Sequence, residues 1–152
     1  MIKNLKKIKL LIIFILINNC GFVPIYSKQF NESIKFQEIS VIGDENVVFF
    51  VENKLNEHKS DTINENKIKA NVNYSKVSAI NNTKGKTSKY KITISISFDI
   101  LFNNVTKNIN INESYFMNSF DDIFEEENYE KNLTKDAVNS IINKLFLQIL
   151  SS

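Results

Sequence analysis

The chain contains one cysteine, Cys20, which follows eight consecutive apolar residues at positions 10–17. A thiolate is a good nucleophile, so a cysteine at the end of an export signal can take a diacylglycerol group as a thioether. Four lysines and no acids precede the apolar run, which is the charge pattern of an export signal. A membrane-spanning helix needs about 20 apolar residues, so this run is too short for one. We predict a lipoprotein signal peptide at 1–19, with N-acyl and S-diacylglycerol lipid on Cys20.

The part that would remain after removal of the signal, residues 20–152, has the length of a single domain. Without a second cysteine it can form no intramolecular disulfide, so we expect a hydrophobic core to stabilise it. The formal net charge of +2 becomes about −2 once the four signal lysines are removed, because 15 lysines then face 17 acids. This charge does not predict a nucleic-acid partner.

Positive charge is nevertheless concentrated in one region, since residues 66–98 contain seven lysines and no acid. Four of them surround an expected turn between two strands: Lys84, Lys86, Lys89 and Lys91. Lysines in such a cluster can contact anionic lipid headgroups or phosphates as point charges. The alternative is that they discourage aggregation at strand edges.

Residues for catalysis are scarce, so we expect that the protein is not an enzyme. The single histidine, His58, is expected to be exposed at a helix end, because metal ligands and catalytic bases usually occur in clusters. The acids at positions 121–127 lack the spacing of a calcium loop and are expected to be a solvated helix start. We predict no metal and no cofactor apart from the covalent lipid.

The regular elements follow from hydrophobic periodicity. Residues 34–42 are expected to form a strand whose apolar parity changes near Glu38, which indicates a bulge. Asp44 is expected to cap a helix that ends near His58. Strict alternation then predicts three antiparallel strands with one apolar and one polar face. Their apolar positions include Ile68, Ala70, Val72 and Tyr74; Tyr90, Ile92, Ile94, Ile96, Phe98, Ile100 and Phe102; and Val105, Ile109, Ile111, Tyr115 and Met117.

A long helix is expected at about residues 122–150, with a capping box formed by Ser119 and Asp122 and an interruption near 128–132. The element order β-α-β-β-β-α predicts an α+β fold, a two-layer sandwich. Its sheet would have about four mostly antiparallel strands, with both helices packed on one face.

The segment Cys-Gly-Phe-Val-Pro-Ile-Tyr at 20–26 resembles the start of the mature lipopolysaccharide-assembly lipoproteins, the LptE family of Gram-negative bacteria. The residues that carry the resemblance are Cys20, Gly21, Phe22, Pro24 and Tyr26. The order of the later elements is similar as well. The chain departs from the usual lipoprotein signal at Asn18 and Asn19, where small residues are expected.

The resemblance implies a lipid-anchored, periplasm-facing protein of the outer membrane. It would partner the β-barrel of the lipopolysaccharide translocon (LptD), occupy its lumen as a plug and assembly factor, and help insert lipopolysaccharide into the outer leaflet. A sheet face of Thr, Ser, Asn and Lys suits a wet barrel interior. The alternative is a free-standing periplasm-facing lipoprotein that binds a ligand or peptide without a barrel partner.

Overall fold

The computed structural model describes residues 34–61 and 65–151, and the predicted signal peptide, Cys20 and the motif at 20–26 lie outside them. The described part has six regular elements: β1 (Glu38–Gly43), α3 (Glu45–Asn56), β2 (Lys67–Asn81), β3 (Thr87–Phe102), β4 (Val105–Asn118) and α4 (Ile123–Leu150). This order and the α+β class confirm the prediction.

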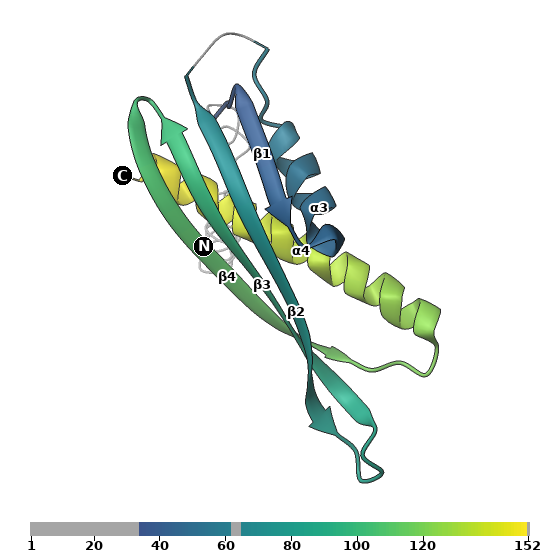
Figure 1. The fold of residues 1–152 in the computed structure, drawn as a ribbon. Helices are drawn as coiled ribbons and strands as arrows, with labels where there is room; N and C mark the ends of the chain where they lie inside the picture. The colour runs from purple at the N-terminus through teal and green to yellow at the C-terminus, as the bar shows by residue number, and fades with distance from the viewer. Residues whose placement is uncertain (1–33, 62–64, 152) are drawn as a thin grey trace, which may run out of the picture. The chain divides into compact units, whose positions relative to one another are not determined.

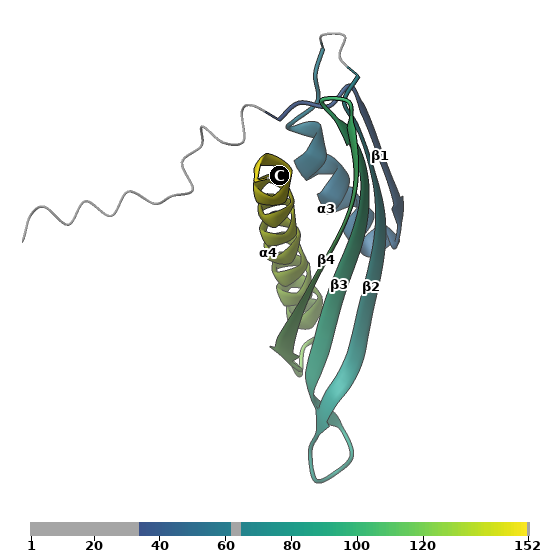
Figure 2. The same cartoon turned by 90° about the vertical axis from the view of Figure 1, so that its left-hand side faces the viewer.

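One four-stranded sheet, ordered β1-β2-β3-β4, forms the first layer (Figure 1). β1 is parallel to β2, and the other two pairings are antiparallel. Both helices lie on the same face, and the opposite face carries no helix (Figure 2). The β2–β3 hairpin extends beyond β1 and both helices in the two views.

The core lies between the sheet and the helices, where the predicted alternation holds. The side chains of Ile92, Ile94, Ile96, Phe98 and Ile100 are buried, because all of them point toward the helices from β3. Helix α4 covers them with a stripe of side chains spaced three and four residues apart. The buried residues of that stripe are Thr134, Ala137, Val138, Ile141, Ile142, Leu145, Phe146 and Ile149.

Two turns show why the chain reverses where it does. Asn103 and Asn104 both have positive φ, 50° and 63°, which a two-residue hairpin loop requires and asparagine tolerates. Gly43 has a φ of +129° at the junction of β1 and α3. A Cβ added there would lie 2.0 Å from the carbonyl oxygen of Val72, so the backbones are too close for any side chain.

Several local predictions require correction. The first strand begins at Glu38, and Phe36 before it makes only an isolated bridge to Lys59. Asp122 alone caps α4 by accepting from the Phe124 and Glu125 amides, whereas Ser119 bonds the Thr87 carbonyl. Helix α4 is also continuous through 128–132, where Glu130 bonds Lys76 and Tyr74 of β2 and so holds this part of the helix to the sheet.

Candidate functional site

The basic cluster predicted around the hairpin lies at the end that extends past the helices. Lys84 and Lys86 lie in or beside the β2–β3 turn, and Lys89 and Lys91 point from β3 to the uncovered face. All four are exposed, and Lys86 forms an ion pair of 3.3 Å with Asp121. Both partners of that pair are strongly solvated, so it contributes little stability. The structure therefore brings the four lysines together at the hairpin end of the described sheet.

The other lysines of the basic stretch do not join this cluster. Lys67 pairs with Glu38 at the far end of β2, and Lys69 is opposite Asp99 of β3. The hydrogen bond to Glu38 raises the pKa of Lys67. Lys76 lies on the helix-covered face, where it bonds two acids of α4. Only the hairpin part of the stretch is free for an external anion.

Apolar side chains flank the basic end of the uncovered face. Lys91 of β3 lies directly opposite Val77 of β2 on one side and Phe116 of β4 on the other. Val77 is 51% exposed and Phe116 is 65% exposed, although both are large and apolar. Ile80, opposite Lys89, is also exposed. The hairpin therefore presents positive and apolar groups side by side, whereas the sequence pattern predicted a polar face there.

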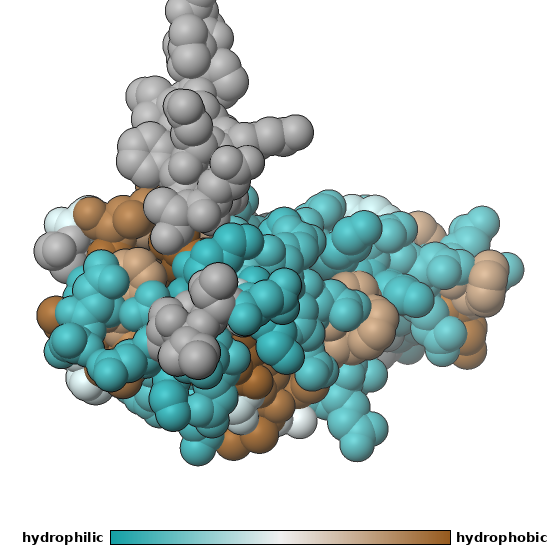
Figure 3. All heavy atoms as spheres, turned by 90° about the horizontal axis from the view of Figure 1, so that it is seen from above, coloured by the Kyte–Doolittle hydropathy of each residue, from teal (hydrophilic) through white to brown (hydrophobic). Residues whose placement is uncertain are grey.

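The middle of the uncovered face consists of small neutral polar side chains in register across three strands. The rows run from β2 through β3 to β4: Ser75, Thr93 and Ser114; Asn73, Ser95 and Asn112; Asn71, Ser97 and Asn110. Hydroxyl and amide groups in adjacent strands bond one another, as in the 2.9 Å contact between Thr93 and Ser114. This confirms the predicted polar face at the centre of the sheet. Hydrophilic side chains also cover much of the surface seen in Figure 3.

Two polar clusters on the covered face were not predicted. In the first, Lys76 Nζ lies 2.6 Å from Glu130 and 2.9 Å from Glu126, and 4.3 Å from the ring centre of Tyr90. Tyr74 donates its hydroxyl to Glu130. The hydrogen bond from Lys76 lowers the pKa of Glu126. Despite partial burial, the bonds to Glu130 and Glu126 raise the pKa of Lys76.

The second cluster surrounds Glu113, a buried carboxylate of β4. Its Oε1 accepts from Ser140 Oγ and Lys144 Nζ, each at 2.6 Å, and Tyr115 donates to its other oxygen. Glu113 alternates in phase with Ile111 and Tyr115, and Lys76 alternates in phase with Tyr74, so both charged residues occupy the apolar face of their strands. A charged residue at an apolar position of the alternation was therefore the signal in the sequence for these clusters. Both clusters tie α4 to the sheet.

His58 is buried, so the prediction that it is exposed was wrong. Its ring centre lies 4.4 Å from that of Phe146, and its Nδ1 is 3.1 Å from the Ile34 carbonyl oxygen. Burial lowers the pKa of His58, and the hydrogen bond to Ile34 opposes this effect only in part. The neutral imidazole therefore packs between α4 and the segment that leads into β1.

Among residues 34–61 and 65–151, no group of three or more histidine, cysteine, aspartate or glutamate side chains could hold a metal ion. Over the same residues, neither helix combines the length and apolarity needed to cross a bilayer. The described chain offers two kinds of surface that could bind a partner. One is the uncovered sheet face with its basic hairpin, and the other is a groove between α3 and α4.

Comparison with known proteins gives a likeness in structure alone. No family model matches the sequence, and no curated protein matches it. The crystal structure of rare lipoprotein B from Shewanella oneidensis superposes with a TM-score of 0.53 at 10% identity, covering 75% of this chain and 97% of that one. The solution structure of an uncharacterized lipoprotein B from Nitrosomonas europaea gives a TM-score of 0.52 at 12% identity, covering 76% and 83%. The chain therefore has the fold of these bacterial lipoproteins.

Proposed function

We propose that the protein is an outer-membrane lipoprotein, anchored through lipid on Cys20, that partners the LptD-type β-barrel of the lipopolysaccharide translocon. The observation that carries this proposal is the uncovered sheet face, whose central rows are small, neutral and polar. The interior of a large membrane barrel is polar and hydrated, so a plug inside it needs such a surface. The fold shared with lipoprotein structures also supports the proposal.

The basic hairpin gives the proposed plug a contact for lipopolysaccharide. Lys84, Lys89 and Lys91 can meet phosphates, and the exposed Val77 and Phe116 beside Lys91 can meet acyl chains. An amphiphile with phosphate and apolar parts is complementary to this mixture, whereas a purely ionic ligand would leave the apolar groups in water. The role is one of binding and assembly, without a catalysed reaction.

Affinity purification of the full chain from detergent-solubilised membranes of its own host tests the partnership. We expect a large outer-membrane barrel to co-purify in an amount comparable with the tagged protein. Recovery of the tagged lipoprotein without any barrel would favour the alternative, a free-standing lipoprotein that binds a ligand or peptide. An unrelated tagged outer-membrane lipoprotein serves as the control for nonspecific recovery.

A further inference from the structure

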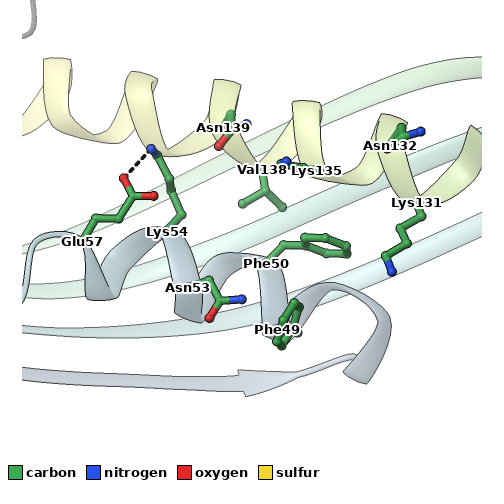
Figure 4. Close-up of a pocket in the computed structure, with 10 residues that line it drawn as sticks. All are labelled: Phe49, Phe50, Asn53, Lys54, Glu57, Lys131, Asn132, Lys135, Val138 and Asn139. Atoms are coloured by element: carbon green, nitrogen blue, oxygen red, sulfur yellow. Dashed lines mark hydrogen bonds and ion pairs between the residues drawn. The ribbon is translucent and has the colours of Figure 1, made fainter. Parts of the chain in front are cut away.

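A groove runs between α3 and the first half of α4, on the layer away from the uncovered sheet face. Its smaller part has a volume of about 330 Å³ and has Phe49, Phe50 and Val138 as apolar lining. A larger hollow of about 600 Å³ adjoins it and shares Phe49, Phe50 and Lys131. Figure 4 shows Val138 and Lys131 of α4 directed toward the side of α3 that carries the two phenylalanines.

Phe49 is one of several large apolar residues that are exposed in the described part of the chain. It is 63% exposed, and its ring is held edge-on against Phe50 with the ring centres 5.7 Å apart. An exposed aromatic side chain that is already fixed by a neighbour loses little conformational entropy on binding. A well-packed aromatic side chain that a partner covers completely can contribute a large share of the binding free energy. Phe49 and Phe50 therefore form a surface on which an apolar side chain of a partner could pack.

In the smaller part of the groove, the charges favour an anionic occupant, because three lysines and one acid line it. Lys131 and Lys135 lie one turn apart on its rim, and within the described residues neither forms an ion pair or hydrogen bond. Lys54 is already paired with Glu57 at 2.6 Å. The larger hollow at the other end contains three acids, but Lys76 pairs with two of them, Glu126 and Glu130, and only Glu127 has no such partner there. An anionic occupant is therefore attracted to the part beside Lys131 and Lys135, whereas the larger hollow has no comparable excess of positive charge.

We infer that this groove binds an acidic peptide segment of a protein partner, with one large apolar side chain placed against Phe49 and Phe50. Three amide side chains, Asn53, Asn132 and Asn139, line the smaller part and offer both donors and acceptors. These match the N–H and C=O groups of a peptide backbone, whereas the phosphates of a lipid headgroup could use only the donors. This inference goes beyond the proposed function and does not require a barrel.

The test uses the full chain in phosphatidylcholine nanodiscs and a fluorescent peptide of sequence Glu-Asp-Phe-Glu-Leu-Asp, followed by fluorescence anisotropy. We expect saturable binding that weakens about tenfold in the variant Lys131→Glu/Lys135→Glu, since two attractive charges become repulsive. Phe49→Ala should weaken it to a similar degree. The matched control Lys84→Glu/Lys89→Glu changes the net charge equally, at the hairpin, and should bind within about twofold of the unaltered protein.

Three results would overturn the inference. The first is absence of saturable peptide binding, and the second is equal weakening by the groove and hairpin variants. The third is displacement of the peptide by phosphatidylglycerol vesicles together with loss of vesicle binding in Lys131→Glu/Lys135→Glu, which would assign the groove to an anionic lipid. Circular dichroism of each variant confirms that it is folded. None of these results bears on whether a barrel co-purifies, so the two proposals can fail separately.

Discussion

Lys76 of β2 and Glu130 of α4 form a partly buried ion pair at 2.6 Å, and this pair joins the sheet to the helix. Glu126 shares the same ammonium group at 2.9 Å. Removing the lysine would leave two partly buried carboxylates without their cation. A partly buried pair of this kind costs more to break than a solvated one.

We expect Lys76→Met to lower the free energy of unfolding by about 1–3 kcal/mol, because the carboxylates of Glu126 and Glu130 lose their partner. Urea denaturation followed by circular dichroism measures this. The matched control is Lys67→Met, which breaks the exposed pair with Glu38 and should change the free energy of unfolding far less, because solvent screens that pair. Equal costs for the two variants would contradict the role assigned to the Lys76 cluster.

His58 predicts a dependence of stability on pH. The folded protein favours its neutral imidazole, whereas the unfolded chain protonates with the ordinary pKa of 6.5. The unfolded state therefore binds more protons just below pH 6.5, so stability is greatest above that pH and falls as the pH decreases toward the lowered pKa. We expect the melting temperature to fall between about pH 7.5 and about pH 5.5.

The variant His58→Gln isolates this contribution, since glutamine can still bond the Ile34 carbonyl but does not titrate. Its melting temperature should change less over the same pH interval, whatever its absolute value. An unchanged slope would show that other groups cause the pH dependence.

Two glycines with positive φ provide a test of backbone packing. Gly43→Ala should destabilise the protein by more than about 2 kcal/mol, because the new Cβ would collide with the Val72 carbonyl and the φ of +129° is strained for alanine. Gly85 has a φ of +79°, but a Cβ there meets nothing within 4 Å. Gly85→Ala should therefore cost only about 1 kcal/mol. Thermal unfolding of both variants gives the comparison, and a reversed order would contradict the described junction of β1 and α3.

Lipopolysaccharide binding can be assigned to the hairpin by a pair of matched variants. Lys84→Glu/Lys89→Glu should weaken binding of purified lipopolysaccharide about tenfold, because two exposed cations become anions beside the phosphates. Lys131→Glu/Lys135→Glu makes the same change in net charge on the opposite layer and should leave binding within about twofold. Surface plasmon resonance at constant salt measures both. Weakening of equal size in the two variants would show an effect of net charge alone.

The anchor is tested in cells by Cys20→Ala. A single acyl chain binds membranes only marginally, whereas the two or three chains of a lipoprotein cysteine hold stably, so the variant should leave the membrane fraction. Fractionation and mass spectrometry of the N-terminal peptide measure this. A protein that stays membrane-bound without Cys20, or an unmodified Cys20 in the parent, would contradict lipidation.

The sequence predicted most of the fold because each strand and helix has a hydrophobic pattern that is visible in its own residues. The alternation that predicts β3 and the Asn103-Asn104 pair that predicts the turn after it can both be recognised from neighbouring residues alone. The burial of His58 could not be found in this way, since Phe146 and Ile34, which cover it, are distant in sequence.

The candidate site was predicted less completely than the fold. The four hairpin lysines and the polar centre of the sheet were found from composition and parity. The sequence did not show that Val77 and Phe116 lie on the same surface, because their proximity depends on the register of three strands. The groove between α3 and α4 was missed because it depends on how two helices meet.

We propose that the polar sheet face meets the wall of a barrel. A photoreactive benzoylphenylalanine in place of Ser95, in the middle of that face, tests it in living cells. After irradiation we expect a covalent adduct that mass spectrometry identifies as a large outer-membrane β-barrel, and no adduct without irradiation. A folded, membrane-bound protein that gives no barrel adduct from position 95 would contradict contact between this face and a barrel.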